Sequence, residues 1–249
     1  MGKIVAIGGG EIVSSDDNGS ETMDIDNEIM HMTGKKNPQL VFLPTASNDS
    51  RTYIDMVYNY FGQKLGCKVS SLEIATKDYT DKELEKSILH ADIVYVGGGD
   101  TRLMLEKWKI AHLDQILIKS YYETDIILSG LSAGAICWFK YGSSDCHKFE
   151  DASARLTCLP GLGLINLSIS PHYNSETDRR SYFQEMLSLT NNTGVGLDDC
   201  CAISIAEDNF KIISSRDNSY AWVSKWNNNN FREEKFGDGK VGRLIDLLW

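Results

Sequence analysis

The sequence predicts an α/β fold in which a mostly parallel sheet lies between layers of helices, a three-layer sandwich. Three observations predict it. Apolar runs rich in Val, Ile and Leu recur along the first half, longer segments with helical spacing separate them, and the last third holds short strand-like runs divided by turn signals. Continuous apolar runs are typical of strands buried on both faces. We therefore expect right-handed crossovers and a ligand site at the carboxyl ends of the strands.

The strands of the parallel sheet are expected at five apolar runs, residues 3–8, 39–44, 69–74, 92–96 and 125–128. The first, fourth and fifth runs lead directly into glycines, which indicates tight turns. Between the strands, residues 51–65 place apolar side chains on one helical stripe, and residues 101–120 predict a helix with a break near His112. Thr80 and Glu83 have capping-box spacing, which predicts that a helix begins there.

The last third is different in character. Residues 178–187 predict a helix, and four short strands are expected at residues 195–197, 202–206, 211–214 and 220–223. Turns are expected at residues 208–209 and 227–230, followed by a final hairpin around residues 237–239. We interpret residues 1–249 as one domain, in which residues 206–249 form an antiparallel extension at the edge of the sheet.

Composition excludes several classes of protein. The 249 residues carry a formal net charge of −10, which argues against non-specific binding to nucleic acid or to anionic membranes. No apolar stretch reaches the length of a membrane span or of a signal sequence. Six cysteines without a C-x-x-C pair indicate neither a disulfide scaffold nor a zinc site. We expect a soluble cytoplasmic protein without a metal; a homo-oligomer is compatible with the sequence, which does not specify the oligomeric state.

The segment G-L-S-A-G at residues 130–134 fits the G-x-S-x-G pattern and lies between an apolar strand and an apolar helix start. In that context the serine, Ser132, is expected on a strained turn that holds its hydroxyl out at the carboxyl edge of the sheet. The amide of Ala133 is suited to stabilising a developing negative charge. The alternative is that small residues only pack a close strand–helix junction, but that does not explain a hydroxyl at this position.

A nucleophilic serine needs a base, and His172 is the preferred candidate because it follows a short strand at residues 167–169. His147, in the loop after the serine, is the second choice. A third group should orient the imidazole. We prefer Asp145, because the order Ser132, Asp145, His172 places it in the loop between the other two. The acidic candidates are Asp145, Glu150, Asp151, Asp198 and Asp199.

Three further groups could take part. Residues 97–99 are glycines that end a strand and open a helix, so that Gly98 or Gly99 could supply a second oxyanion donor. Their loop lacks the spacing of a phosphate-binding loop, and the glycines at residues 8–10 do not complete a dinucleotide fingerprint, so we expect no cofactor. Arg179 and Arg180 follow His172 closely and could clamp a substrate carboxylate, or they could be solvent-facing charges at a helix start.

Three motifs resemble those of the peptidase E and cyanophycinase family of serine peptidases: V-G-G-G-D-T at residues 96–101, G-L-S-A-G-A at 130–135 and S-P-H-Y at 170–173. They occur in the family's order, and the resemblance extends to about residue 206. It implies a class I glutamine amidotransferase-like α/β fold with serine in place of the amidotransferase cysteine. It also implies cytoplasmic hydrolysis beside aspartate residues, without metal or cofactor.

The resemblance assigns roles to individual residues. Ser132 matches the nucleophile and His172 the histidine, while Gly98, Gly99 and Ala133 match the oxyanion positions. Asp145 is the nearest match to the acid, at a shorter spacing from the serine, and Glu150 or Asp198 could hold that role instead. Arg179 and Arg180 lie where the family binds the substrate's aspartate, but the preceding loop is shorter here, which puts an Asp-X preference in doubt.

The predicted function is hydrolysis of small peptides through an acyl-enzyme. Two alternatives are a binding or regulatory module of the same fold and an amidase or acyl-transfer enzyme that acts on a non-peptide amide.

Overall fold

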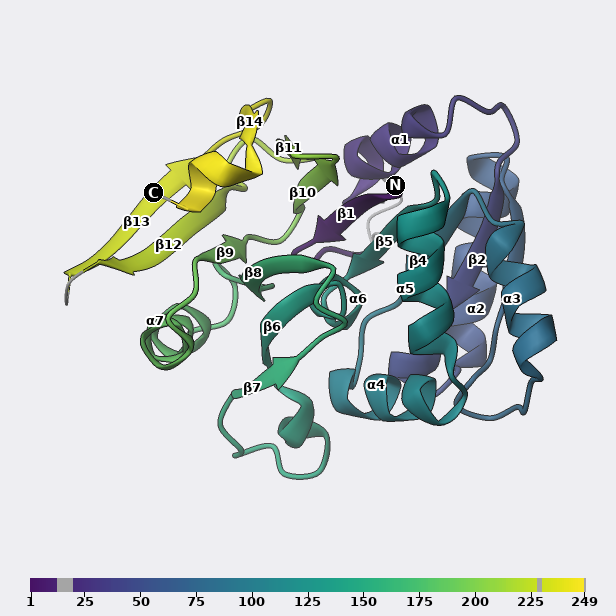
Figure 1. Ribbon diagram of the computed structural model, residues 1–249, viewed down its shortest axis with the longest axis horizontal. Helices are drawn as coiled ribbons and strands as arrows, with labels where there is room; N and C mark the ends of the chain where they lie inside the picture. Colours follow the sequence, from purple (N-terminus) through teal and green to yellow (C-terminus); the bar gives the residue numbers. More distant parts are fainter. Residues whose placement is uncertain (13–19, 228–229, 249) are drawn as a thin grey trace.

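The computed structural model describes residues 1–12, 20–227 and 230–248, and in this part of the chain the strands form two sheets (Figure 1). The first sheet has the order β14-β11-β10-β1-β5-β4-β2-β3. Its parallel part contains all five of the strands expected there: β1 (Lys3–Ile7), β2 (Gln39–Leu43), β3 (Lys68–Ser71), β4 (Ile93–Val96) and β5 (Ile127–Leu131). Antiparallel strands continue it beyond β1: β10 (Cys201–Ala206), β11 (Asn209–Ser214) and β14 (Val241–Arg243).

Helices cover both faces of this parallel part. On one face lie α1 (Met23–Met32) and α2 (Arg51–Val57), and α2 continues as a π-helix over Tyr58–Lys64. On the other face lie α3 (Asp81–Leu89), α4 (Thr101–Ile110) and α5 (Leu113–Glu123). Alternate residues of the strands enter the two buried clusters, so that Ile93 and Tyr95 face α1 and α2 while Val94 and Val96 face the opposite side. The two-sided burial explains why these strands are apolar without alternation.

Local signals set the helix boundaries. Thr80 accepts the Glu83 N–H and Glu83 accepts the Thr80 N–H, which confirms the predicted capping box at the start of α3. The break expected near His112 is also present, because His112 has a φ of 58° and separates α4 from α5. A left-handed residue cannot continue a right-handed helix, so the chain changes direction there.

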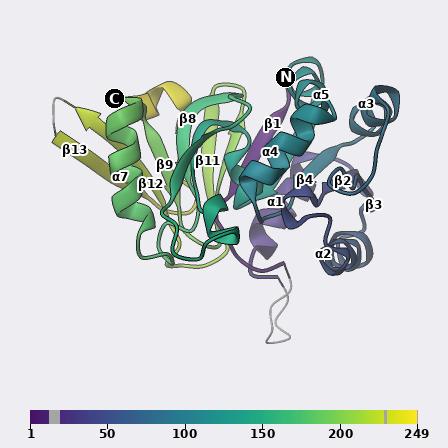
Figure 2. The ribbon, with the colours of Figure 1, turned by 90° about the horizontal axis from the view of Figure 1, so that it is seen from below.

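The second sheet has the order β13-β12-β9-β8-β6-β7 and was not foreseen as a separate sheet. In it, β8 lies parallel to both β6 and β9, and α7 (Arg179–Thr190) packs on one face (Figure 2). Its strands are β6 (Phe139–Ser144), β7 (Thr157–Pro160), β8 (Ile165–Ser170), β9 (Gly194–Leu197), β12 (Ala221–Asn227) and β13 (Asn230–Phe236). The largest buried cluster contains residues of both sheets, including Val96 and Leu128 of the first with Ile169 and Val195 of the second.

Two sequence expectations are corrected here. The helix after Ser132, α6, spans only Ala133–Ile136, because the chain turns at Cys137 and Trp138 and then enters β6 at Phe139. The C-terminal strands do not form one edge extension, since β11 and β14 join the first sheet while β12 and β13 join the second. The turn at residues 237–239 therefore connects two sheets and is no hairpin. Phe236 at the end of β13 stacks on Phe210 of β11 at a ring-centroid distance of 6.0 Å, which holds this crossing together.

No helix within the described residues combines the length and the apolar character that crossing a bilayer requires.

Candidate active site

Strand ends from both sheets meet at the candidate site. Ser132 follows β5, His172 follows β8 by two residues, and Asp199 follows β9 by two residues. The glycine turn after β1 joins the sheets at this place. The Ser132 N–H donates to the Ile7 carbonyl at 3.1 Å, and the His172 N–H donates to the Gly8 carbonyl at 3.0 Å. Main-chain hydrogen bonds to two consecutive residues at the end of β1 therefore position the backbone of both residues.

Ser132, His172 and Asp199 form a continuous hydrogen-bonded chain. The distance from Ser132 Oγ to His172 Nε2 is 2.9 Å, and that from His172 Nδ1 to Asp199 Oδ1 is 2.7 Å. An ionised carboxylate can only accept, so Nδ1 carries the ring proton and Nε2 accepts the Ser132 O–H. The imidazole is thus oriented to remove the hydroxyl proton, which is what a nucleophilic serine requires.

The electrostatics favour an ionised Asp199. Burial opposes its ionisation, but hydrogen bonds from His172 and Ser175 outweigh that effect and hold the pKa of Asp199 below its usual value. The Asp199 N–H also donates to Asn174 Oδ1 at 3.0 Å, which fixes the backbone beside the carboxylate. A carboxylate held in this way stabilises the imidazolium that forms when the serine loses its proton.

The backbone at Ser132 makes the sharp turn that the G-x-S-x-G pattern predicts. Ser132 has φ 57° and ψ −109°, a region that L-residues rarely occupy and that costs about 1–3 kcal/mol. Two glycines make room for it. A Cβ on Gly130 would overlap the Gly134 carbonyl, and a Cβ on Gly134 would overlap the Val96 carbonyl. The motif's glycines are therefore required by close backbone contacts on both sides of the serine.

Gly9 has a role that sequence reasoning missed. A Cβ there would overlap the Asp199 carboxylate and lie 2.6 Å from two atoms of the His172 ring. In the sequence, the glycines at residues 8–10 resembled only an incomplete dinucleotide fingerprint. In the structure, Gly9 leaves the space that the His172–Asp199 pair occupies. No side chain larger than hydrogen fits at residue 9 while that pair is in place.

The structure corrects the expected acid. Asp145 lies 3.5 Å from Arg179, and Asp199 instead contacts the imidazole. The physical reason is strand order. Because β8 lies between β6 and β9, Asp145 and Asp199 follow the strands on either side of the one that leads to His172. Asp145 forms an ion pair with Arg179. A signal for Asp199 existed: the strand expected at residues 195–197 ends just before it, as the strand before His172 does.

The other acidic candidates are engaged elsewhere. Glu150 pairs with Arg102, and Asp151 accepts from Ser153. Asp198 is buried and accepts hydrogen bonds at 3.0 Å from the Tyr220 N–H and from Trp222 Nε1. Burial raises the pKa of Asp198, in contrast to that of Asp199. The Asp198 carboxylate thus anchors the end of β9 to β12 and is directed to that strand rather than to the imidazole of His172. His147, the second choice for the base, lies in a short 3-10 turn at Cys146–Phe149.

Neither predicted clamp residue is free. Arg179 is 1% exposed and donates to Glu176 and to the Ser143 carbonyl, each at 2.7 Å, besides its contact with Asp145. Arg180 pairs with Glu233, and its guanidinium lies 4.4 Å from the Trp222 ring centroid. Acidic side chains therefore already occupy the Arg179 guanidinium, and its burial contradicts the alternative of a solvent-facing charge.

Two of the three expected oxyanion residues, Gly98 and Ala133, lie next to the serine. A Cβ on Gly98 would be 3.6 Å from Ser132 Cβ, so the glycine loop after β4 borders the nucleophile. Ala133 is the first residue of α6, and its N–H has no acceptor within the helix. Because α6 has only four residues, the individual amides rather than a helix dipole are the source of positive charge here.

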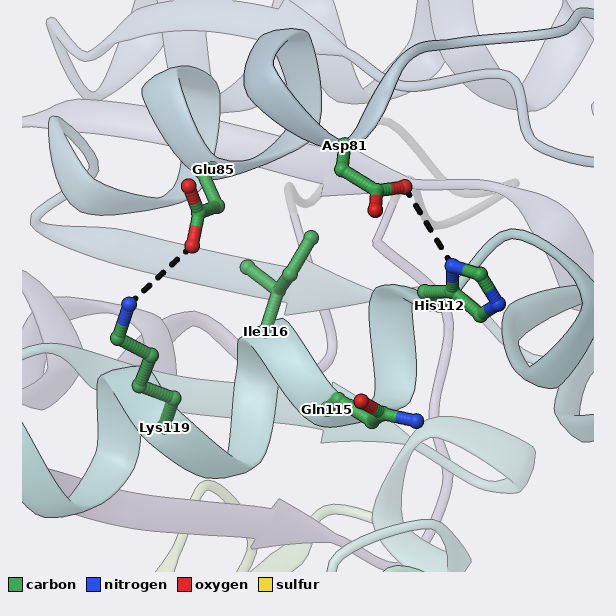
Figure 3. Close-up of a pocket in the computed structure, with 6 residues that line it drawn as sticks. All are labelled: Asp81, Glu85, His112, Gln115, Ile116 and Lys119. Carbon is green, nitrogen blue, oxygen red and sulfur yellow. Dashed lines mark hydrogen bonds and ion pairs between the residues drawn. The ribbon is translucent and has the colours of Figure 1, made fainter.

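One surface hollow elsewhere holds charged groups. It lies between α3 and α5, where Asp81 faces His112 and Glu85 faces Lys119 at 3.2 Å (Figure 3). It contains none of the residues of the candidate site, and its charges are paired on exposed side chains. Across the described ranges, no three His, Cys, Asp or Glu side chains are grouped so that they could hold a metal ion.

Comparisons with known proteins show similarity to a peptidase family. The family model of Peptidase family S51 matches residues 4–213. The chain is 36% identical over 226 residues to the uncharacterised peptidase YgaJ of Bacillus subtilis (strain 168), covering 89% of this chain and 91% of that protein.

Two solved structures are also similar. A peptidase from an acI-B1 actinobacterium has a TM-score of 0.69 at 16% identity, covering 98% of this chain and 97% of its own. A candidate peptidase E protein from Listeria monocytogenes EGD-e has a TM-score of 0.62 at 20% identity, covering 86% and 98% respectively. At these identities, the two structures show a shared fold alone.

Proposed function

The chain belongs to peptidase family S51 and is a serine-type peptidase, and from this premise we propose that Ser132, His172 and Asp199 hydrolyse small peptides through an acyl-enzyme. The observation that carries the proposal is the hydrogen-bonded chain from Ser132 Oγ through the imidazole to the Asp199 carboxylate, with distances of 2.9 and 2.7 Å.

The proposed mechanism assigns each group one task. His172 Nε2 takes the hydroxyl proton as Ser132 Oγ attacks the scissile carbonyl carbon, and Asp199 stabilises the imidazolium. The Ala133 N–H and a glycine amide of the loop after β4 bind the oxyanion. His172 then gives the proton to the leaving amine. A water molecule, activated by the same nitrogen, cleaves the acyl-enzyme and restores Ser132.

For the substrate, we propose a small peptide without an obligatory aspartate. An Asp-X preference through Arg179 would require its guanidinium to leave Glu176 and Asp145, and the loss of these contacts from a 1% exposed cation is costly. Arg180 would similarly have to leave Glu233 and Trp222. These contacts support recognition of the peptide by groups other than this arginine pair.

We also propose that the fold is of the class I glutamine amidotransferase-like, three-layer type. The parallel order of β3, β2, β4, β5 and β1, with helices on both faces and the serine at the end of β5, supports this. A cytoplasmic location is part of the same proposal and rests on the family resemblance.

The test compares wild type with Ser132→Ala on a panel of dipeptides and isopeptides with aspartyl, glutamyl and neutral first residues. We expect the variant to lose several orders of magnitude in kcat on every substrate that the wild type cleaves. A fluorophosphonate probe should label wild type stoichiometrically at Ser132. If Ser132→Ala retained full hydrolysis, the mechanism would be wrong.

The same experiment separates the two alternatives. A binding or regulatory module would neither be labelled nor cleave any peptide. An amidase or acyl-transfer enzyme that acts on non-peptide amides would be labelled at Ser132 but would cleave none of the peptides in the panel.

A further inference from the structure

Tyr53, in the first turn of α2, is the aromatic residue that covers the glycine loop after β4. A Cβ on Gly97 would lie 2.8 Å from its ring, and the ring packs edge-on against Phe42 with centroids 5.1 Å apart. The helix start is fixed, because the Ser50 side chain accepts the Tyr53 N–H. The Tyr53 hydroxyl then accepts a hydrogen bond from the Gly98 N–H at 3.4 Å.

In the loop at residues 97–100, every backbone N–H except one has a hydrogen-bond acceptor among the described residues. The Gly97 N–H donates to the Leu43 carbonyl at 3.1 Å, and the Asp100 N–H donates to the Ala46 carbonyl at 2.8 Å. With Gly98 bound to Tyr53, the amide of Gly99 is the one for which the described residues offer no acceptor. Gly99 has a φ of 136°, and a Cβ there would overlap the Ala46 carbonyl, so its backbone conformation is open only to glycine.

We propose that Tyr53 is a positioning residue of the oxyanion site: its hydroxyl holds the Gly98 amide, and this leaves the Gly99 N–H to act with that of Ala133 beside Ser132. The inference rests on the proposed function and deepens it. It chooses Gly99 over Gly98 as the second donor and adds a residue that does not touch the substrate.

The charge state of Tyr53 is compatible with this role. Burial raises the pKa of its hydroxyl to about 12, so the group stays neutral over the working range of a peptidase. A phenolate in this place would repel a developing oxyanion, whereas a neutral hydroxyl can accept the Gly98 N–H without opposing the negative charge.

The test is Tyr53→Phe, which keeps the ring on Gly97 and Phe42 and removes only the hydroxyl. The control is Tyr58→Phe, the same change on the π-helical continuation of α2 at an exposed side chain. Both variants are measured for kcat and KM on the best substrate of the peptide panel, for the rate of fluorophosphonate labelling and for Tm. Labelling is informative because the phosphoryl oxygen of the adduct occupies the oxyanion position.

We expect Tyr53→Phe to lower kcat and the labelling rate about tenfold, less than the loss of a direct oxyanion donor, with KM within about twofold and Tm close to that of the control. Unchanged kcat and labelling, or a loss confined to KM, would overturn the inference. These results are distinguishable from failure of the proposed function, which would show as a wild type that is not labelled at Ser132.

Discussion

Replacing Asp199 by asparagine tests the corrected acid most directly. Asn keeps the size of the side chain but removes the negative charge that lies 2.7 Å from His172 Nδ1. The variant loses the stabilisation of the imidazolium, and its amide group can force the wrong ring tautomer by donating to Nδ1. Loss of the acid in a triad of this type lowers kcat by about 10⁴, which corresponds to roughly 5.5 kcal/mol of transition-state stabilisation.

Asp145→Asn is the matched control, because the sequence favoured Asp145 for the same role. Its carboxylate is 3.5 Å from Arg179, which keeps its contacts with Glu176 and the Ser143 carbonyl when Asp145 is neutralised. We expect kcat to stay within about threefold of wild type, since a weak, partly solvated ion pair is worth about 0–1 kcal/mol.

The assay measures kcat on the best peptide substrate and the rate of fluorophosphonate labelling, with Tm as a check on folding. Asp199 is not the acid of the triad if Asp145→Asn loses activity by orders of magnitude while Asp199→Asn remains close to wild type. Equal, small effects of both variants would also contradict this assignment, because the imidazole would then need no carboxylate.

Two further changes test the buried charges. The pKa of Asp26, raised by burial to about 7 from 3.8, means that the folded chain keeps a proton which the unfolded chain releases, so stability falls as pH rises from about 4 to 7 and then levels off. The free energy of unfolding of Asp26→Asn, measured with urea, should lack this fall, so that between pH 4 and pH 8 the variant gains roughly 4 kcal/mol relative to wild type. The same pH profile in both proteins would disprove this expectation. Arg179→Met should cost about 2–3 kcal/mol of stability, less than for fully buried partners since Glu176 and Asp145 are about a third exposed. A higher KM for aspartyl peptides at unchanged stability would instead identify Arg179 as a substrate ligand.

Much of the site could be predicted because its signals are local. Ser132 lies on a turn whose conformation depends on the glycines within two residues of it, and His172 lies just past a recognisable strand. The capping box at Thr80 is likewise a contact between residues three apart. Such features depend on bonded geometry and near neighbours, which a short window of sequence contains.

The identity of the acid depends on contacts between segments that are distant in the sequence. Asp145 and Asp199 both follow strands of the second sheet, and nothing in the segments around them states which strand pairs with which neighbour. The order β9-β8-β6 and the position of Arg179 decide that Asp199 reaches the imidazole. Gly9 is a similar case, since its need to be glycine comes from side chains more than 160 positions away.

Local patterns were sufficient to predict the buried parallel strands, the start of α3, the break between α4 and α5 and the sharp turn at Ser132. Hydrophobic period and local backbone sterics act over only a few residues. Long-range packing set three other features: the division of the C-terminal strands between two sheets, the partner of the imidazole and the contacts of Arg179. These depend on contacts between distant segments, whose free energies are set by the packing of the whole chain.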